Sequence, residues 1–346
     1  MSLVSGWAAF LVTVATLACI YGLLALGLNV HYGYTGLLNF GHVAFFAAGA
    51  YTSAILTMPP PDQVSQASYR FGLDLPMPLG FPVSLTTAAL VGGCLALLIG
   101  LTSVRLGSHY LAIATFALAG VFEDILINEA WLTNGRFGMN EVPKPMRETV
   151  GGDLWPVFYL LVAALTLLGV YLVVRRLIDA PFGRLLRGVR ESEDAARTLG
   201  KNTDVVKLKS FAIGGAIAGL AGGVYAHYVG SVVTAQFVPE VTFVVWAAML
   251  LGGVASSTGA VVGAVLVISF QQSTRFLLPL YEWVQSALPG ALSGVLPALF
   301  APLPDHPSFV PSVRFVVVGL LFVLVIRYRP AGLFGDPSEV EAMGEE

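Results

Sequence analysis

The sequence predicts an all-α membrane protein, a polytopic bundle of about eight to ten transmembrane helices. Hydrophobic residues make up 56% of the chain and charged residues only 11%, whereas a soluble domain carries about 25% charged residues. The mean hydropathy is +0.79. Apolar runs recur along the whole chain, and a helix needs about 20 such residues to cross the hydrocarbon layer of a membrane. We therefore expect one transmembrane domain over residues 1–346.

Nine apolar runs are the candidate spans. They lie at 7–28, 37–57, 83–104, 109–127, 155–174, 210–230, 241–256, 259–278 and 309–326. Two of these runs could instead be re-entrant or broken segments, because 241–256 is short and 37–57 follows a break that contains glycine. Residues 279–308 hold six prolines, which favour short interfacial helices over another span.

The basic residues predict the orientation of these spans. Nine of the eighteen Lys and Arg residues fall in the single connection 175–209. Cytoplasmic loops of membrane proteins carry an excess of basic residues, so this connection is expected in the cytoplasm. Nine crossings then place the N-terminus outside and the C-terminus inside, with an acidic tail at 330–346.

The connection 175–209 also carries a helical pattern. Between Arg184 and Leu199 the apolar residues recur at helical spacing, and Gly200 follows as a typical helix stop. We expect one short helix at the membrane surface. Such a helix is suited to dock into another protein, although a solvated loop with ion pairs of about 0.5 kcal/mol each would show a similar composition.

Residues 181–200 (PFGRLLRGVRESEDAARTLG) resemble the cytoplasmic coupling segment of ABC importer permeases, specifically the M-type permease family of branched-chain amino acid systems. Three further stretches resemble the same family and follow its order along the chain. They are 25–51 (ALGLNVHYGYTGLLNFGHVAFFAAGAY), 250–263 (LLGGVASSTGAVVG) and 329–335 (RPAGLFG). The ordered set covers nearly the whole chain and is more specific than any one stretch.

The resemblance implies the ABC importer permease fold and a multi-pass location in the bacterial inner (plasma) membrane. It implies that the chain forms the pathway for branched-chain amino acids together with a homologous H-type permease. Two cytoplasmic ATPase subunits and a periplasmic solute-binding protein are the other implied partners. The sequence lacks the G-x-x-x-x-G-K-[ST] loop that cradles ATP phosphates. We therefore expect no cofactor and no enzyme activity in this chain, with ATP and Mg²⁺ bound by the ATPase partners.

Seven residues of the coupling segment are expected to contact an ATPase subunit, because small alanines permit close approach and a glycine lets the chain turn back. They are Arg190, Glu191, Asp194, Ala195, Ala196, Leu199 and Gly200.

Six polar residues near breaks or span ends are candidates for lining the pathway: Asn29, Tyr34, Thr35, Asn39, His42 and Glu123. Non-helical backbone is tolerated in lipid only where protein buries it or where it lines a wet cavity. Asn39 and His42 have the i, i+3 spacing of one helix face. That face either lines the pathway or fixes the packing of a neighbouring helix through hydrogen bonds. Glu123 lies beside Asp124 near the outer end of its span, where snorkelling to the interface is the alternative.

Gly215, Gly219 and Gly223 form a strip of small residues at four-residue spacing. Such a strip lets another helix approach closely, either within the chain or from the partner permease. The histidines have no second ligand at metal-site spacing, so no metal site is expected.

Two other functions compete with an importer of branched-chain amino acids. A related ABC permease for urea or short amides would share the same motifs. An ion-coupled secondary transporter would need ionisable residues deep in its spans, and apart from Glu123 and Asp124 the runs carry few of them.

Overall fold

The structure, a computed structural model, describes residues 3–60, 69, 71–103, 105–273, 319–320, 323, 327–328 and 331–335. The predicted span 309–326, the proline-rich segment 279–308 and the acidic tail 330–346 lie wholly or mostly outside the described residues.

Eight of the nine predicted runs coincide with helices, which confirms the all-α bundle. These are α1 (Leu3–His31), α2 (His42–Thr57), α3 (Met77–Ser103), α4 (Ser108–Asn128), α7 (Trp155–Asp179), α10 (Thr203–Val229), α11 (Pro239–Gly252) and α12 (Ser257–Ser273). Within the described residues, six helical stretches are long and apolar enough to cross a membrane, whereas α2 and α12 are shorter. The prediction at 37–57 began too early, because the chain becomes helical only at His42.

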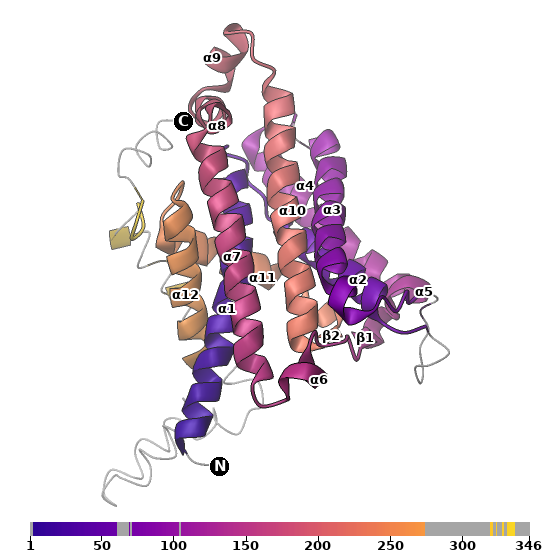
Figure 1. Cartoon of the computed structure of the whole chain (residues 1–346). Coiled ribbons are helices and arrows are strands. Elements are labelled where there is room, and N and C mark those ends of the chain that lie inside the picture. Colours follow the sequence, from indigo (N-terminus) through magenta and orange to yellow (C-terminus); the bar gives the residue numbers. More distant parts are fainter. Residues whose placement is uncertain are drawn as a thin grey trace, which may run out of the picture.

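The two ends of the bundle differ (Figure 1). Helices α8 (Pro181–Glu191) and α9 (Glu193–Thr198) project at one end, while the N-terminus and α6 (Arg147–Val150) lie at the other. The connection that holds α8 and α9 is the one rich in basic residues, for which the sequence predicts a cytoplasmic location. We therefore call its end of the bundle the cytoplasmic end and the N-terminal end the external end.

Short elements cover the external end of the bundle. They are α5 (Ala130–Thr133), η2 (Gly135–Phe137), β1 (Met139–Asn140) and α6 on one connection, with β2 (Ser231–Val232) and η3 (Thr234–Gln236) on another. The strands β1 and β2 pair antiparallel, with Met139 opposite Val232. This small pairing fixes the loop between α4 and α7 against the external end of α10.

Helix α10 lies at the centre of the bundle because its glycines let other helices approach. A side-chain carbon at Gly219 would come within 2.3 Å of the carbonyl oxygen of Ala88 in α3. A carbon at Gly215 would come within 2.2 Å of Ala96, and one at Gly223 within 3.2 Å of Ala88. The glycine strip therefore lies against α3 of the same chain, the first of its two expected roles.

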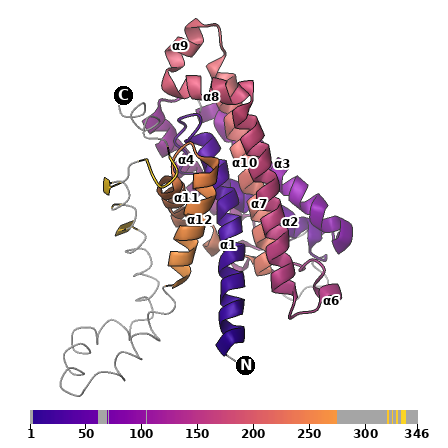
Figure 2. The same cartoon turned by 60° about the vertical axis from the view of Figure 1, so that its left-hand side comes forward.

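In their most apolar stretches, α4 and α7 bury only 22% and 17% of their residues, whereas α10 and the stretch that ends in α11 each bury 56%. Along α7 the exposed large side chains include Leu161, Leu165, Leu168 and Leu172. Helices α1, α11 and α12 pack side by side (Figure 2). The outer faces of α4 and α7 are therefore surfaces open to lipid or to a second membrane protein.

Candidate functional site

The cytoplasmic segment consists of two helices rather than the single one predicted between Arg184 and Leu199. Ser192 separates α8 from α9 with an extended backbone (φ −157°, ψ 103°). Its hydroxyl accepts a hydrogen bond from the backbone N–H of Ala195 at 3.2 Å, which makes it the N-cap of α9. Gly200 follows α9 with φ +76°, so the predicted stop is confirmed.

A polar cluster holds α9 against the start of α10. The carboxylate of Glu193 accepts hydrogen bonds from Arg197 at 2.9 Å and from the hydroxyl of Thr203 at 3.0 Å. Lys207 of α10 pairs with the same carboxylate. Glu193 was not among the candidate residues, although its i, i+4 spacing to Arg197 predicts an ion pair on a helix.

Five of the seven residues expected to meet an ATPase subunit lie on the exposed surface of this segment. They are Glu191, Asp194, Ala195, Leu199 and Gly200. Ala196 is buried, and the Arg190 side chain is only 3% exposed. Five of the seven residues are thus exposed at this end of the bundle, and the other two are turned into the protein.

Arg190 connects α8 to the turn that follows α1. Its guanidinium Nη1 donates a hydrogen bond to the backbone carbonyl of Gly33. Gly36 has φ +75°, and a side-chain carbon there would lie 3.1 Å from Cγ of Arg190. The basic side chain is therefore seated in the connector 32–41 between α1 and α2, far from it in the sequence.

Asn39 and His42 do not share a helix face, because Asn39 lies in the non-helical connector. The Asn39 amide donates to Nδ1 of His31 at 3.0 Å and accepts from the backbone N–H of Gly41 at 2.9 Å. Trp246 of α11 donates to the Asn39 carbonyl at 3.0 Å. Asn39 thus links the end of α1 and the middle of α11 to the residues that precede α2.

The two histidines of this region are buried and hydrogen-bonded. His31 Nε2 donates to the carbonyl of Phe211 in α10 at 3.0 Å, and His42 Nε2 donates to the carbonyl of Leu24 in α1 at 3.1 Å. The His31 ring also stacks on the Phe211 ring with centroids 4.7 Å apart. These contacts agree with the second alternative for His42, a role in helix packing. They give the same role to His31, which was not among the candidate residues.

The remaining candidates of this region are Asn29 at the end of α1 and Tyr34 and Thr35 in the connector, and each contacts a distant part of the chain. Asn29 accepts a hydrogen bond from the backbone N–H of Ala255 at 3.0 Å, and Tyr34 bonds the hydroxyl of Ser257 at 2.8 Å. Thr35 bonds Ser210 of α10 at 2.7 Å. The connector is therefore fastened to the start of α12 and to α10, and the end of α1 is fastened to the turn between α11 and α12.

The C-terminal motif meets the same turn. The backbone N–H groups of Leu333 and Phe334 donate to the carbonyls of Leu251 and Gly252 at 3.0 and 2.8 Å. Three of the four stretches that carry the family resemblance are thus in direct contact, and Arg190 joins the fourth to them. The cytoplasmic end of the bundle is one connected structure.

Glu123 lies on α4, away from this cluster, with its side chain half-buried, and the neighbouring Asp124 is exposed. Neither residue lines the cavities described below.

A cavity of about 310 Å³ lies beside the connector. Its wall includes Tyr34, Arg175, Arg187, Ser257 and Thr258. Tyr34 is therefore the one connector candidate that faces a cavity described here.

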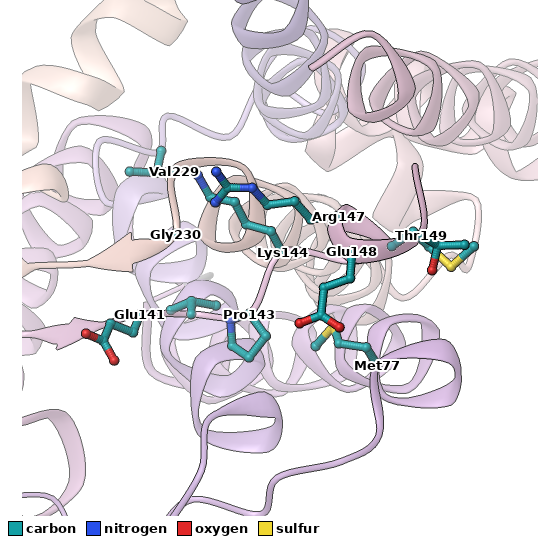
Figure 3. A pocket seen from close by; sticks show the side chains of 11 residues that line it. Met77, Glu141, Pro143, Lys144, Arg147, Glu148, Thr149, Val229 and Gly230 are labelled. Carbon is teal, nitrogen blue, oxygen red and sulfur yellow. The ribbon is translucent and has the colours of Figure 1, made fainter. Parts of the chain in front are cut away.

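A larger cavity of about 720 Å³ lies at the external end (Figure 3). It is lined by Met77, Glu141, Val142, Pro143, Lys144, Met146, Arg147, Glu148, Thr149, Val229 and Gly230. These residues come from the start of α3, the loop before α6, α6 itself and the end of α10, so their adjacency follows from the fold. The one sequence signal was the density of charges in residues 141–148.

Lys144 is the most constrained charge of this cavity. Its ammonium lies over the ring of Trp155, 5.0 Å from the centroid. Partial burial lowers the pKa of Lys144, and the nearby guanidinium of Arg147 lowers this pKa further.

The comparisons with known proteins agree with this architecture. The family described as branched-chain amino acid transport system / permease component matches residues 10–297. The high-affinity branched-chain amino acid transport system permease protein LivM of Salmonella typhimurium is 33% identical over 76% of this chain and 63% of its own length. This chain thus spans just under two thirds of that relative. No solved structure matches.

Two further relatives cover more of their own length. The probable branched-chain amino acid transport permease protein LivM of Methanocaldococcus jannaschii is 25% identical over 92% of this chain and 91% of its own length. The permease protein LivH of Escherichia coli is 26% identical over 78% of this chain and 87% of its own. These relatives are named as transport permeases, not as enzymes. The chain belongs to the branched-chain amino acid transport permease family and is a multi-pass protein of the bacterial inner membrane.

Proposed function

We propose that this chain is one permease subunit of an ATP-driven importer of branched-chain amino acids. The observation that carries the proposal is the seating of Arg190 in the connector 32–41, while other residues of α8 and α9 are exposed at the same end of the bundle. A segment that presents one face to a partner and is fastened by the other to the transmembrane helices is suited to transmit movement.

A homologous H-type permease is the proposed partner in the membrane. Relatives named LivM and LivH both match this chain, as expected where two related permeases form one pathway. The exposed apolar faces of α4 and α7 offer surface for such a partner. Two cytoplasmic ATPase subunits would bind ATP and Mg²⁺, and a periplasmic binding protein would deliver the solute to the external end.

The seven coupling candidates divide into two groups in this mechanism. Glu191, Asp194, Ala195, Leu199 and Gly200 contact the ATPase, and Arg190 and Ala196 join that contact to the bundle. Closure of the ATPase pair would displace α8, and Arg190 would carry the displacement to the connector between α1 and α2. Because the connector is fastened to α10 and to the start of α12, several helices would respond together.

The test uses the complete complex with its natural partners in proteoliposomes. We expect ATP-dependent leucine uptake and stimulated ATP hydrolysis, and we expect both to be lost in Ala195→Arg, whose bulky charge blocks docking at an exposed position. The matched control is Asp153→Arg, a similar substitution at an exposed position of the external end, which should leave uptake unchanged.

The solute is tested in the same preparation. The names of the relatives favour branched-chain amino acids, so excess isoleucine and valine should compete with leucine, and urea or acetamide should not. If uptake persists without ATP in a preparation that contains no ATPase subunit, the importer proposal is rejected. The chain would then be a secondary transporter.

A further inference from the structure

The external cavity holds two basic side chains whose charges are not neutralised. Lys144 and Arg147 both line it (Figure 3). Among the residues that the structure describes, neither has a carboxylate within ion-pair distance. The acidic residues of the same wall stand apart: in Figure 3 the Glu148 side chain extends toward Met77, and Glu141 lies at the far end of the cavity. The two cations are therefore open to an anion from outside.

Local structure fixes the place of Lys144. Lys144 passes over Gly230, where its Cε would lie 2.9 Å from an added side-chain carbon. Gly230 has φ +80° and ends α10, so it supplies both the turn and the room for the lysine stem. Trp155 lies under the ammonium. The lysine is thus held by the end of one membrane helix and the start of another.

Electrostatics favour a carboxylate at this position. Lys144 is partly removed from water and lies near the guanidinium of Arg147, and both effects lower the pKa of Lys144. An anion bound between the two cations would relieve their repulsion. Arginine binds a carboxylate through two parallel hydrogen bonds, and lysine adds a point charge.

The rest of the wall matches the other parts of an aliphatic amino acid. Met77, Met146, Val142 and Val229 offer apolar contact, and methionine adapts to branched side chains of differing shape. Glu141 and Glu148 are available to an ammonium group. A volume of about 720 Å³ lies within the usual range of small-molecule sites.

We propose that this cavity is a binding site for zwitterionic aliphatic amino acids, with the α-carboxylate held between Lys144 and Arg147. The proposal rests on the proposed function and gives it a reception site at the external end of the permease. The site lies at the opposite end of the bundle from the coupling segment (Figure 1).

The experiment measures equilibrium binding of radiolabelled L-leucine to the complete transporter in lipid nanodiscs, without ATP and without the binding protein. We expect saturable binding that unlabelled leucine displaces and that leucinamide, which lacks the carboxylate, does not. Lys144→Gln and Arg147→Gln should each weaken binding at least about tenfold, since each removes a charged donor to the carboxylate.

Two further variants control for charge and folding. Lys144→Arg keeps the charge and should retain binding. Arg136→Gln removes an exposed charge from the same external connection and should bind leucine as the native protein does. Native and variant complexes should show the same thermal stability, so that loss of binding is not loss of fold.

Three results would overturn the site. They are absence of saturable leucine binding to the native complex, equal displacement by leucinamide, and native affinity in both glutamine variants. If the glutamine variants still bind leucine but no longer associate with the periplasmic binding protein, the two cations form a protein-docking contact. The site is rejected in that case too. ATP-dependent leucine uptake by the native complex, measured in parallel, tests the proposed function separately.

Discussion

The guanidinium of Arg190 in α8 donates a hydrogen bond to the backbone carbonyl of Gly33, a residue that lies 157 positions earlier in the chain. Its side chain is 3% exposed, although it belongs to a helix at the cytoplasmic surface. A charged side chain is buried only where it is paired or hydrogen-bonded. The contact therefore couples the position of α8 to the position of the connector between α1 and α2.

Arg190→Ala is expected to uncouple ATP hydrolysis from transport. The substitution removes a charged donor and leaves the Gly33 carbonyl unpaired, a loss of about 1–3 kcal/mol. We expect the amount of leucine imported per ATP hydrolysed to fall about tenfold, with ATPase activity retained, when both are measured in the same proteoliposomes.

The matched control is Arg184→Gln, at an exposed position on the same helix, which should keep the native ratio of transport to hydrolysis. Arg190→Lys, which retains a donor without the planar fork, should fall between the two. A native ratio in Arg190→Ala would show that α8 acts on the bundle through another contact.

Ser192→Ala is expected to loosen α9. The Ser192 hydroxyl caps the helix through the Ala195 N–H, and loss of an N-cap costs about 1 kcal/mol. Hydrogen exchange of the amides in 193–198 should become several-fold faster, whereas Ser192→Asp, which preserves a capping oxygen, should exchange at the native rate. Unchanged exchange in the alanine variant would mean that the contacts of Glu193 alone hold α9.

Asn29→Leu is expected to destabilise the bundle at its cytoplasmic end. Asn29 is fully buried and its side-chain oxygen accepts from the N–H of Ala255. Loss of this acceptor leaves a polar group unpaired, at a cost of about 1–3 kcal/mol. The melting temperature in detergent should fall by several degrees. Asn128→Leu, at an exposed helix end, should change it little, and equal melting of both variants would contradict the role of Asn29.

Most of the helices could be predicted from the apolar runs, because a span must be long and apolar wherever it crosses lipid. The break between α8 and α9 at Ser192 could not be predicted from apolar spacing. Its apolar spacing continues through Ser192, and a serine is equally compatible with an exposed helix face and with an N-cap.

The site was harder to predict than the helices. A charge on an amphipathic surface helix is expected to face water, and the carbonyl of Gly33 that draws Arg190 inward lies far away in the sequence. The i, i+3 argument for Asn39 and His42 failed because the connector stays non-helical up to residue 41. The external cavity is assembled from α3, the loop before α6 and the end of α10, and no local pattern brings these segments together.

Gly219→Val is expected to disrupt the packing of α10 on α3. A first side-chain carbon would already lie 2.3 Å from the carbonyl oxygen of Ala88, so the backbones must separate. We expect loss of the folded complex or a marked fall in its melting temperature. Gly169→Ala in α7 has no atom within 4 Å of the added carbon and should be neutral or slightly stabilising, because alanine favours helix. Similar stability of the two variants would contradict the central place of α10.

Binding at the external cavity is expected to weaken as the pH rises. Lys144 must be charged to hold a carboxylate, and its pKa is lowered by partial burial and by Arg147. The charged form is therefore lost at a lower pH than for an ordinary lysine, whose pKa is about 10.4. The other ionisable side chains of the wall are those of Arg147, Glu141 and Glu148.

The suitable probe is 4-methylpentanoate, whose only ionisable group is a carboxylate that remains charged throughout. Its dissociation constant for the complex in nanodiscs should rise with pH through the lowered pKa of Lys144. Lys144→Arg should abolish this dependence, because arginine does not titrate in the range. A dependence that is the same in native protein and in Lys144→Arg would assign the titration to another group.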